Sequence, residues 1–151
     1  MSNFMRSRAA GALLTAAIVG LTLATAYIHF SLGGLLFTLN ATGYAVAAVA
    51  IVVGAAATHP FIRSFSWLPR IGLMGYAATT IVAYLVMGPY FSLGWMAKGI
   101  EIALIGVLAV DILRVYGSAL GLVWAAMESL SPFVPARFRG ESRAGFLTDS
   151  Y

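Results

Sequence analysis

The sequence contains no cysteine. Disulfides, thiolate metal sites and cysteine nucleophiles are therefore excluded. Charge is scarce as well, because charged residues make up 9% of the chain, against about 25% in soluble domains. Since 61% of the 151 residues are hydrophobic, too few polar side chains remain to cover a soluble core. The composition predicts one compact domain of an integral membrane protein.

The sequence contains a single lysine, Lys98. The net charge of +4 comes mostly from arginines, which are scattered along the chain and form no basic stripe. This pattern gives no support to nucleic-acid binding. In a membrane protein, an excess of arginine is first a signal of orientation.

Four apolar segments are candidates to cross a bilayer, at residues 9–30, 35–58, 71–87 and 91–114. About 20 apolar residues are needed to span a hydrocarbon core of about 30 Å. Gly33-Gly34, His59-Pro60 and Gly88-Pro89 separate the segments, and glycine and proline are typical of turns and helix ends. The sequence predicts an all-α bundle of four transmembrane helices, in which His59 ends the second helix.

Residues 115–130 are apolar, but they are too few for a fifth span. We expect a bend near Gly117 or Gly121, followed by an interfacial helical segment on the cytoplasmic side. Residues 1–130 then form the membrane domain, and residues 131–151 form a polar cytoplasmic tail.

Arginines mark one side of the predicted bundle. The turns at residues 31–34 and 88–90 carry no charge, and the positive-inside rule assigns the arginine-bearing side to the cytoplasm. Both termini are therefore expected in the cytoplasm, in a bacterial-type inner membrane or a plasma membrane. The arginines on that side are Arg6, Arg8, Arg63, Arg70, Arg114, Arg137, Arg139 and Arg143.

The fourth segment carries the ionisable residues Lys98, Glu101, Asp111 and Arg114. Each such residue costs about 2.5–3.5 kcal/mol at the centre of a membrane helix. We therefore expect this segment to face the interior of the bundle. The residues come in two pairs, each three positions apart, and such neighbours lie on the same helix surface.

The two pairs are given different interpretations. Asp111 and Arg114 are interpreted as a structural ion pair at the inner edge of the membrane. Lys98 and Glu101 lie deeper, and two alternatives stay open for them. They form a structural ion pair, or they form a ligand or ion pathway in which Glu101 is the carboxylate, Lys98 its partner, and Asn40 and His29 line the approach.

Small residues recur at spacings of four in the predicted helices, and such spacing lets helix backbones approach closely in lipid. Internal packing explains most of these pairs. Gly117 and Gly121 are the best candidates for an interface with another subunit or a second copy, because they lie beyond the bundle.

No catalytic motif or cofactor motif stands out. His29 and His59 are expected near opposite edges of the membrane, so one chain does not supply both axial ligands of a haem from them. No metal-binding cluster, phosphate loop, dinucleotide fingerprint or nucleophile–base arrangement is found. The protein is therefore expected to be no enzyme and to hold no metal or cofactor.

Two functions remain open. The favoured one is a non-catalytic membrane subunit or scaffold, which packs through its small-residue faces into a larger membrane complex or a homo-oligomer. The alternative is a small oligomeric transporter or channel that uses the pair of Glu101 and Lys98. The expected partners are the lipid bilayer and other membrane subunits or copies of the chain itself.

Overall fold

A computed structural model describes residues 7–133, and within this range the fold is entirely helical. Ser7 caps the first helix, because its hydroxyl accepts a hydrogen bond from the backbone N–H of Ala10 at 3.1 Å. The helices are α1 (Arg8–Leu32), α2 (Leu35–Ala56), α3 (Pro60–Ser64), α4 (Trp67–Met87), α5 (Ser92–Tyr116) and α6 (Ala119–Leu130), followed by a 3₁₀ turn at Ser131–Phe133.

Three stretches of the described residues are long and apolar enough to cross a membrane. They are Arg8–Leu32, Leu35–Ala56 and Pro60–Met87, the last of which joins α3 and α4. This finding supports a multi-pass membrane protein. Helix α5 is not among the three, and it carries the four ionisable residues Lys98, Glu101, Asp111 and Arg114.

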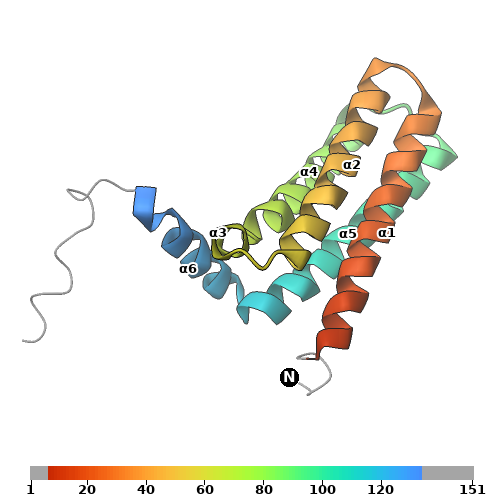
Figure 1. The fold of residues 1–151 in the computed structure, drawn as a ribbon. Helices are drawn as coiled ribbons and strands as arrows, with labels where there is room; N and C mark the ends of the chain where they lie inside the picture. The colour runs from red at the N-terminus through yellow and green to blue at the C-terminus, as the bar shows by residue number, and fades with distance from the viewer. Residues whose placement is uncertain (1–6, 134–151) are drawn as a thin grey trace, which may run out of the picture.

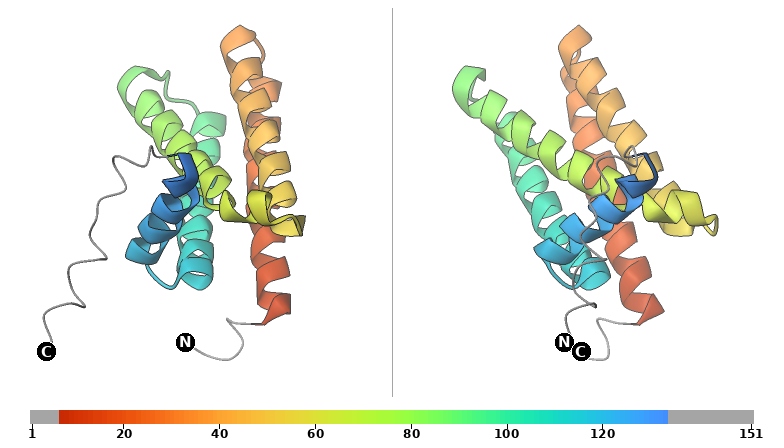
Figure 2. Two further views of the ribbon diagram at one scale, coloured as in Figure 1. Left: turned by 60° about the vertical axis from the view of Figure 1, so that its left-hand side comes forward. Right: turned by 90° about the vertical axis from the view of Figure 1, so that its left-hand side faces the viewer.

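The four long helices form two hairpins (Figure 1). The first hairpin is α1 and α2, which reverse direction at Gly33 and Gly34, both with positive φ angles that favour glycine. The second hairpin is α4 and α5, joined at residues 88–91. Figure 2 shows the two hairpins lying closest at the end where α3 is found and separating toward the end with the turns.

The hydrophobic core lies where all four long helices meet. Ile18 of α1, Tyr44 of α2, Leu73 of α4 and Leu104 and Leu108 of α5 are fully buried there. Most other large apolar side chains point outward and are exposed. Exposed apolar helix faces of this kind fit a lipid environment and do not fit water.

The predicted segments agree with the helices to within a few residues, with two differences. Residues 61–70, which lie between two predicted segments, contain most of the short helix α3 and the first turn of α4. His59 was expected to end the second helix, but α2 ends at Ala56 and His59 is the N-cap residue of α3. The cause is Pro60, which occupies the first position of α3 and starts a new helix there.

The chain bends sharply between α5 and α6, where the sequence suggested a bend. Gly117 ends α5 with φ of 77°, a value that favours glycine. Ser118 then caps α6 by accepting a hydrogen bond from the N–H of Gly121 at 2.9 Å. A Cβ atom at Gly121 would collide with the carbonyl oxygen of Tyr116. Both glycines thus have a local role in the bend.

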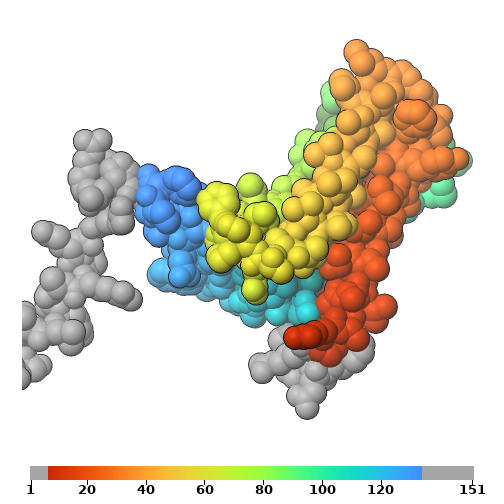
Figure 3. Space-filling view, viewed as in Figure 1, coloured from red at the N-terminus to blue at the C-terminus, as the bar shows by residue number. Residues whose placement is uncertain are grey.

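Helix α6 folds back beside α3, at the end of the bundle away from the two turns (Figure 3). The indole N–H of Trp67 donates a hydrogen bond to the hydroxyl of Ser129 at 3.0 Å. The hydroxyls of Ser66 and Tyr116 lie 3.2 Å apart. The first contact fixes α6 to the start of α4, and the second joins the end of α5 to the residue before α4. The predicted polar tail lies outside the described residues from position 134 onward.

Candidate functional site

A buried cluster of polar side chains surrounds Glu101 of α5. The Glu101 side chain is fully buried, and Lys98 and His29 are only 5% and 4% exposed. The carboxylate oxygen Oε2 accepts two hydrogen bonds, from the Lys98 ammonium at 2.5 Å and from the Thr80 hydroxyl at 2.8 Å. Three helices, α1, α4 and α5, therefore contribute to the site around one carboxylate.

Tyr44 extends this cluster to α2. Its hydroxyl lies 2.9 Å from the hydroxyl oxygen of Thr80. Thr80 has one hydroxyl proton, so when it donates to Glu101 it accepts from Tyr44. The resulting chain of hydrogen bonds runs from Tyr44 through Thr80 to Glu101 and connects α2, α4 and α5 in the protein interior.

His29 faces the other oxygen of the same carboxylate. Its Nδ1 lies 2.9 Å from the carbonyl oxygen of Thr25, one turn earlier in α1. Its Nε2 lies 3.8 Å from Oε1 of Glu101, which is beyond hydrogen-bond distance. Within residues 7–133, Oε1 of Glu101 is buried and has no hydrogen-bond partner.

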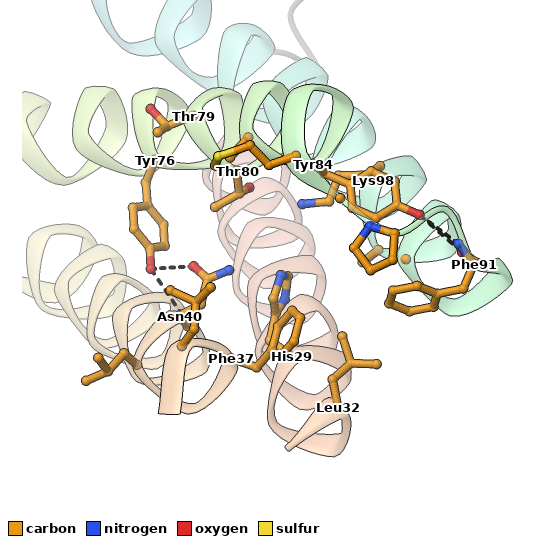
Figure 4. Close-up of a pocket in the computed structure, with 18 residues that line it drawn as sticks. His29, Leu32, Phe37, Asn40, Tyr76, Thr79, Thr80, Tyr84, Phe91 and Lys98 are labelled. Carbon is orange, nitrogen blue, oxygen red and sulfur yellow. Dashed lines mark hydrogen bonds between the residues drawn. The ribbon is translucent and has the colours of Figure 1, made fainter. Parts of the chain in front are cut away.

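A cavity of about 420 Å³ lies directly beside this cluster. Figure 4 shows His29, Asn40, Thr80 and Lys98 around it, drawn from all four long helices. Leu32 and residues 88, 89 and 91 also line it, which places the cavity at the end of the bundle where the two hairpins separate. Glu101 is not part of its wall.

Asn40 lies on the opposite side of the cavity from Lys98 and belongs to a separate hydrogen bond. The hydroxyl of Tyr76 donates to the side-chain oxygen of Asn40 at 2.5 Å. Figure 4 shows the amide nitrogen of Asn40 on the side that faces His29. The structure therefore brings His29, Lys98 and Glu101 into contact, whereas Asn40 shares the cavity wall with His29 and Lys98 and has no hydrogen bond to them.

A second charged cluster lies near the other end of α5. The Arg70 guanidinium donates from Nε to Asp111 Oδ2 at 2.8 Å, and its Nη1 donates to the Ser66 carbonyl at 2.6 Å. Arg114 approaches the other carboxylate oxygen at 3.6 Å. The pair expected from the sequence is therefore a cluster of three residues, in which Arg70 is the closer partner of Asp111.

The described residues contain no group of three or more His, Asp or Glu side chains placed to hold a metal ion. Lys98, with a positive charge, also faces the carboxylate that His29 approaches. The Lys98 ammonium would repel a metal ion bound at this carboxylate.

Sequence reasoning missed four residues of this region. Tyr44, Arg70 and Thr80 belong to the two clusters, and Tyr76 lines the cavity. A signal existed for two of them, because Tyr76 and Thr80 are four positions apart and share one face of an apolar helix. Arg70 lies just before the predicted segment at residues 71–87, and nothing in its local sequence indicates a buried partner 41 positions away.

The chain matches no family model, no curated protein and no solved structure.

Proposed function

We propose that α5 is a fourth membrane span and that both termini face the cytoplasm. Helix α5 has 25 residues, or about 37 Å at 1.5 Å per residue. Its ionisable side chains Lys98, Glu101 and Asp111 are buried against the other helices, while apolar side chains such as Met96 and Ile102 point outward. This distribution is the one that a membrane helix with ionisable residues requires.

The orientation is testable because the chain has no cysteine. We expect a membrane-impermeant thiol reagent, applied to intact cells, to label Tyr90→Cys and to leave Arg63→Cys unlabelled. Both positions are exposed and lie at opposite ends of α4. Both variants should react after the membrane is opened. Labelling of Arg63→Cys in intact cells would contradict the cytoplasmic assignment.

For the function, we propose a small transporter that binds an amphiphilic ligand in the cavity of about 420 Å³. The observation that carries this proposal is the buried charge cluster beside that cavity. Buried ionisable side chains inside a membrane domain are costly and commonly belong to substrate or proton pathways. The cavity is lined by polar side chains such as His29 and Lys98 and by many apolar side chains such as Leu32, Leu36 and Phe37. This lining suits a ligand with a polar head and an apolar body.

A non-catalytic subunit or scaffold is the second candidate, and one observation on α6 favours it. Leu120, Val123, Trp124 and Met127 are exposed and follow the spacing of a single helix face. Such a stripe fits the surface of a bilayer or the groove of a partner subunit. An apolar stripe on α6 does not conflict with a ligand in the cavity, so the two functions are compatible.

One experiment addresses both candidates. We expect native mass spectrometry of gently extracted protein to show a small molecule bound to the unaltered chain. Ala83→Trp, which fills the cavity from its wall, should lose this molecule. Ala78→Trp, on the exposed face of the same helix, is the matched control and should keep it.

The outcomes separate the candidates. A bound molecule that survives Ala83→Trp would contradict the cavity as its site. A chain that carries only other polypeptides and no small molecule would favour the subunit function. A chain that carries neither would count against both proposals.

A further inference from the structure

His29 and Glu101 face each other with one hydrogen-bond acceptor atom each. The carbonyl oxygen of Thr25 can only accept a hydrogen bond, so Nδ1 of His29 must carry the proton in their 2.9 Å contact. In a neutral imidazole the second nitrogen, Nε2, then has a lone pair and no proton. This lone pair faces the carboxylate oxygen Oε1 of Glu101 at 3.8 Å.

A proton between these two atoms would satisfy both. Protonated His29 would keep its bond to Thr25 through Nδ1 and would direct an N–H group at Oε1 of Glu101. That oxygen is buried and, among the described residues, lacks any other donor. A buried acceptor without a donor is unfavourable, so the site is built to take up one proton.

We infer that His29 and Glu101 form a proton-binding site, and that the adjoining cavity takes an amphiphilic monoanion, a carboxylate on an apolar body, together with that proton. This inference rests on the proposed function, because it concerns the same cavity and names the class of its ligand.

The preference for an anion follows from what the cavity exposes. Lys98 and His29 line the cavity, whereas Glu101 lies behind them and is fully buried. Within residues 7–133, Lys98 has one hydrogen-bond acceptor, Oε2 of Glu101, and its other N–H groups remain available. The oxygen of Asn40 accepts from Tyr76, which leaves the Asn40 amide N–H groups to donate. A carboxylate head matches these donors.

Charge balance couples the anion to the proton. With His29 neutral, the formal charges of Lys98 and Glu101 cancel. Proton uptake gives the cluster one positive charge, which is costly inside a membrane unless an anion accompanies it. A monoanion next to Lys98 restores neutrality. By linkage, each partner then increases the affinity of the other.

The groups around His29 do not offer a competing proton site. Tyr44 of α2 has its ring 5.6 Å from the His29 ring, and Tyr76 of α4 packs on Tyr44. Lys98 and Glu101 of α5 are the charged groups that face His29. Among these described groups, only the contact between His29 and Glu101 brings together two acceptors that one added proton would join.

The test uses three probes of one shape and different charge: naphthalene-2-carboxylate, 2-naphthylmethanol and 2-naphthylmethylammonium. Binding to the full-length protein in lipid nanodiscs is measured by calorimetry between about pH 6 and about pH 8, a range in which carboxylates stay ionised. We expect the carboxylate to bind most tightly. Its affinity should rise by up to about tenfold for each unit of pH decrease, as one coupled proton requires.

Proton uptake is measured directly by repeating the titration in buffers with different ionisation enthalpies. We expect close to one proton taken up for each anion bound. In His29→Gln, the side-chain amide can donate an N–H to Glu101 without taking up a proton from solution. The anion affinity of this variant should therefore lose its pH dependence. His59→Gln changes the other histidine, which is exposed and outside the cavity, and should behave like the unaltered protein.

Each result decides a different point. Anion binding without proton uptake would overturn the proton site and leave the transporter proposal standing. Preference for the alcohol or the ammonium probe would overturn the anion assignment alone. If none of the probes binds, although Ala83→Trp displaces a native molecule, the ligand class is wrong. If Ala83→Trp displaces nothing, the proposed function itself fails. These measurements on the unaltered protein decide the question even if His29→Gln does not fold.

Discussion

Asp111→Asn is expected to destabilise the protein by about 3–5 kcal/mol, the usual cost of removing one partner from a buried ion pair. Asp111 is buried, and it accepts from the Arg70 guanidinium at 2.8 Å. The neutral amide would leave the buried positive charge of Arg70 without its carboxylate. To measure this loss, the protein in mild detergent is titrated with a denaturing detergent, and its unfolding is monitored by circular dichroism.

Glu128→Gln is the matched control for this change. It also replaces an acidic side chain by its amide, but Glu128 is exposed on α6. Exposed charges contribute about 0–1 kcal/mol, so its unfolding curve should nearly overlay that of the unaltered protein. Equal stability of the two variants would show that the contact between Arg70 and Asp111 contributes little to joining α4 and α5.

Lys98→Met is the second change with a large expected effect, again about 3–5 kcal/mol. It leaves the fully buried carboxylate of Glu101 with the hydroxyl of Thr80 as its remaining hydrogen-bond donor among the described residues. The variant loses stability because a buried charge without its counter-charge is unfavourable. Unfolding in mild detergent measures the loss.

The double change Lys98→Met and Glu101→Leu should recover most of this stability. Replacing both members of a buried ion pair by apolar residues is often neutral or stabilising. Thr80 would then donate to the carbonyl oxygen of Ala77, which lies 2.9 Å away. A double variant as unstable as Lys98→Met would contradict the pairing. The coupling energy follows from a double-mutant cycle.

The double variant also separates structure from function at this site. If Lys98 and Glu101 serve only to hold helices together, a stable double variant should keep the properties of the unaltered protein. If they serve a ligand, the double variant should fold and yet fail to bind the carboxylate probe. The sequence left these two alternatives open, and this variant distinguishes them.

The sequence by itself determined the environment and the class of fold. Long apolar segments interrupted by glycine and proline predict membrane helices, because the length of the hydrocarbon core and the chemistry of helix ends act locally. The bend at Gly117 was predictable for the same reason, since an apolar helix that continued past it would exceed the thickness of a bilayer. His59 was assigned wrongly because α2 ends at Ala56 and Pro60 begins a new helix four residues later.

Part of the candidate site was predictable too. Lys98 and Glu101 are neighbours on one helix, and this spacing alone brings them together. His29 was placed near them by estimating its depth in the membrane. The depth of a residue, however, does not determine the direction in which its side chain points around the helix axis. Depth alone therefore did not predict that His29 lies beside Glu101 while Asn40 bonds to Tyr76.

Only the tertiary structure decided which helices meet and which faces they turn to each other. Helices in lipid associate by close packing, and many pairs of small residues in this chain satisfy that requirement equally well. The sequence therefore does not select among the pairings. The partner of Asp111 is Arg70 on another helix, and the cavity exists because the two hairpins separate beside Lys98. Both depend on contacts between distant residues.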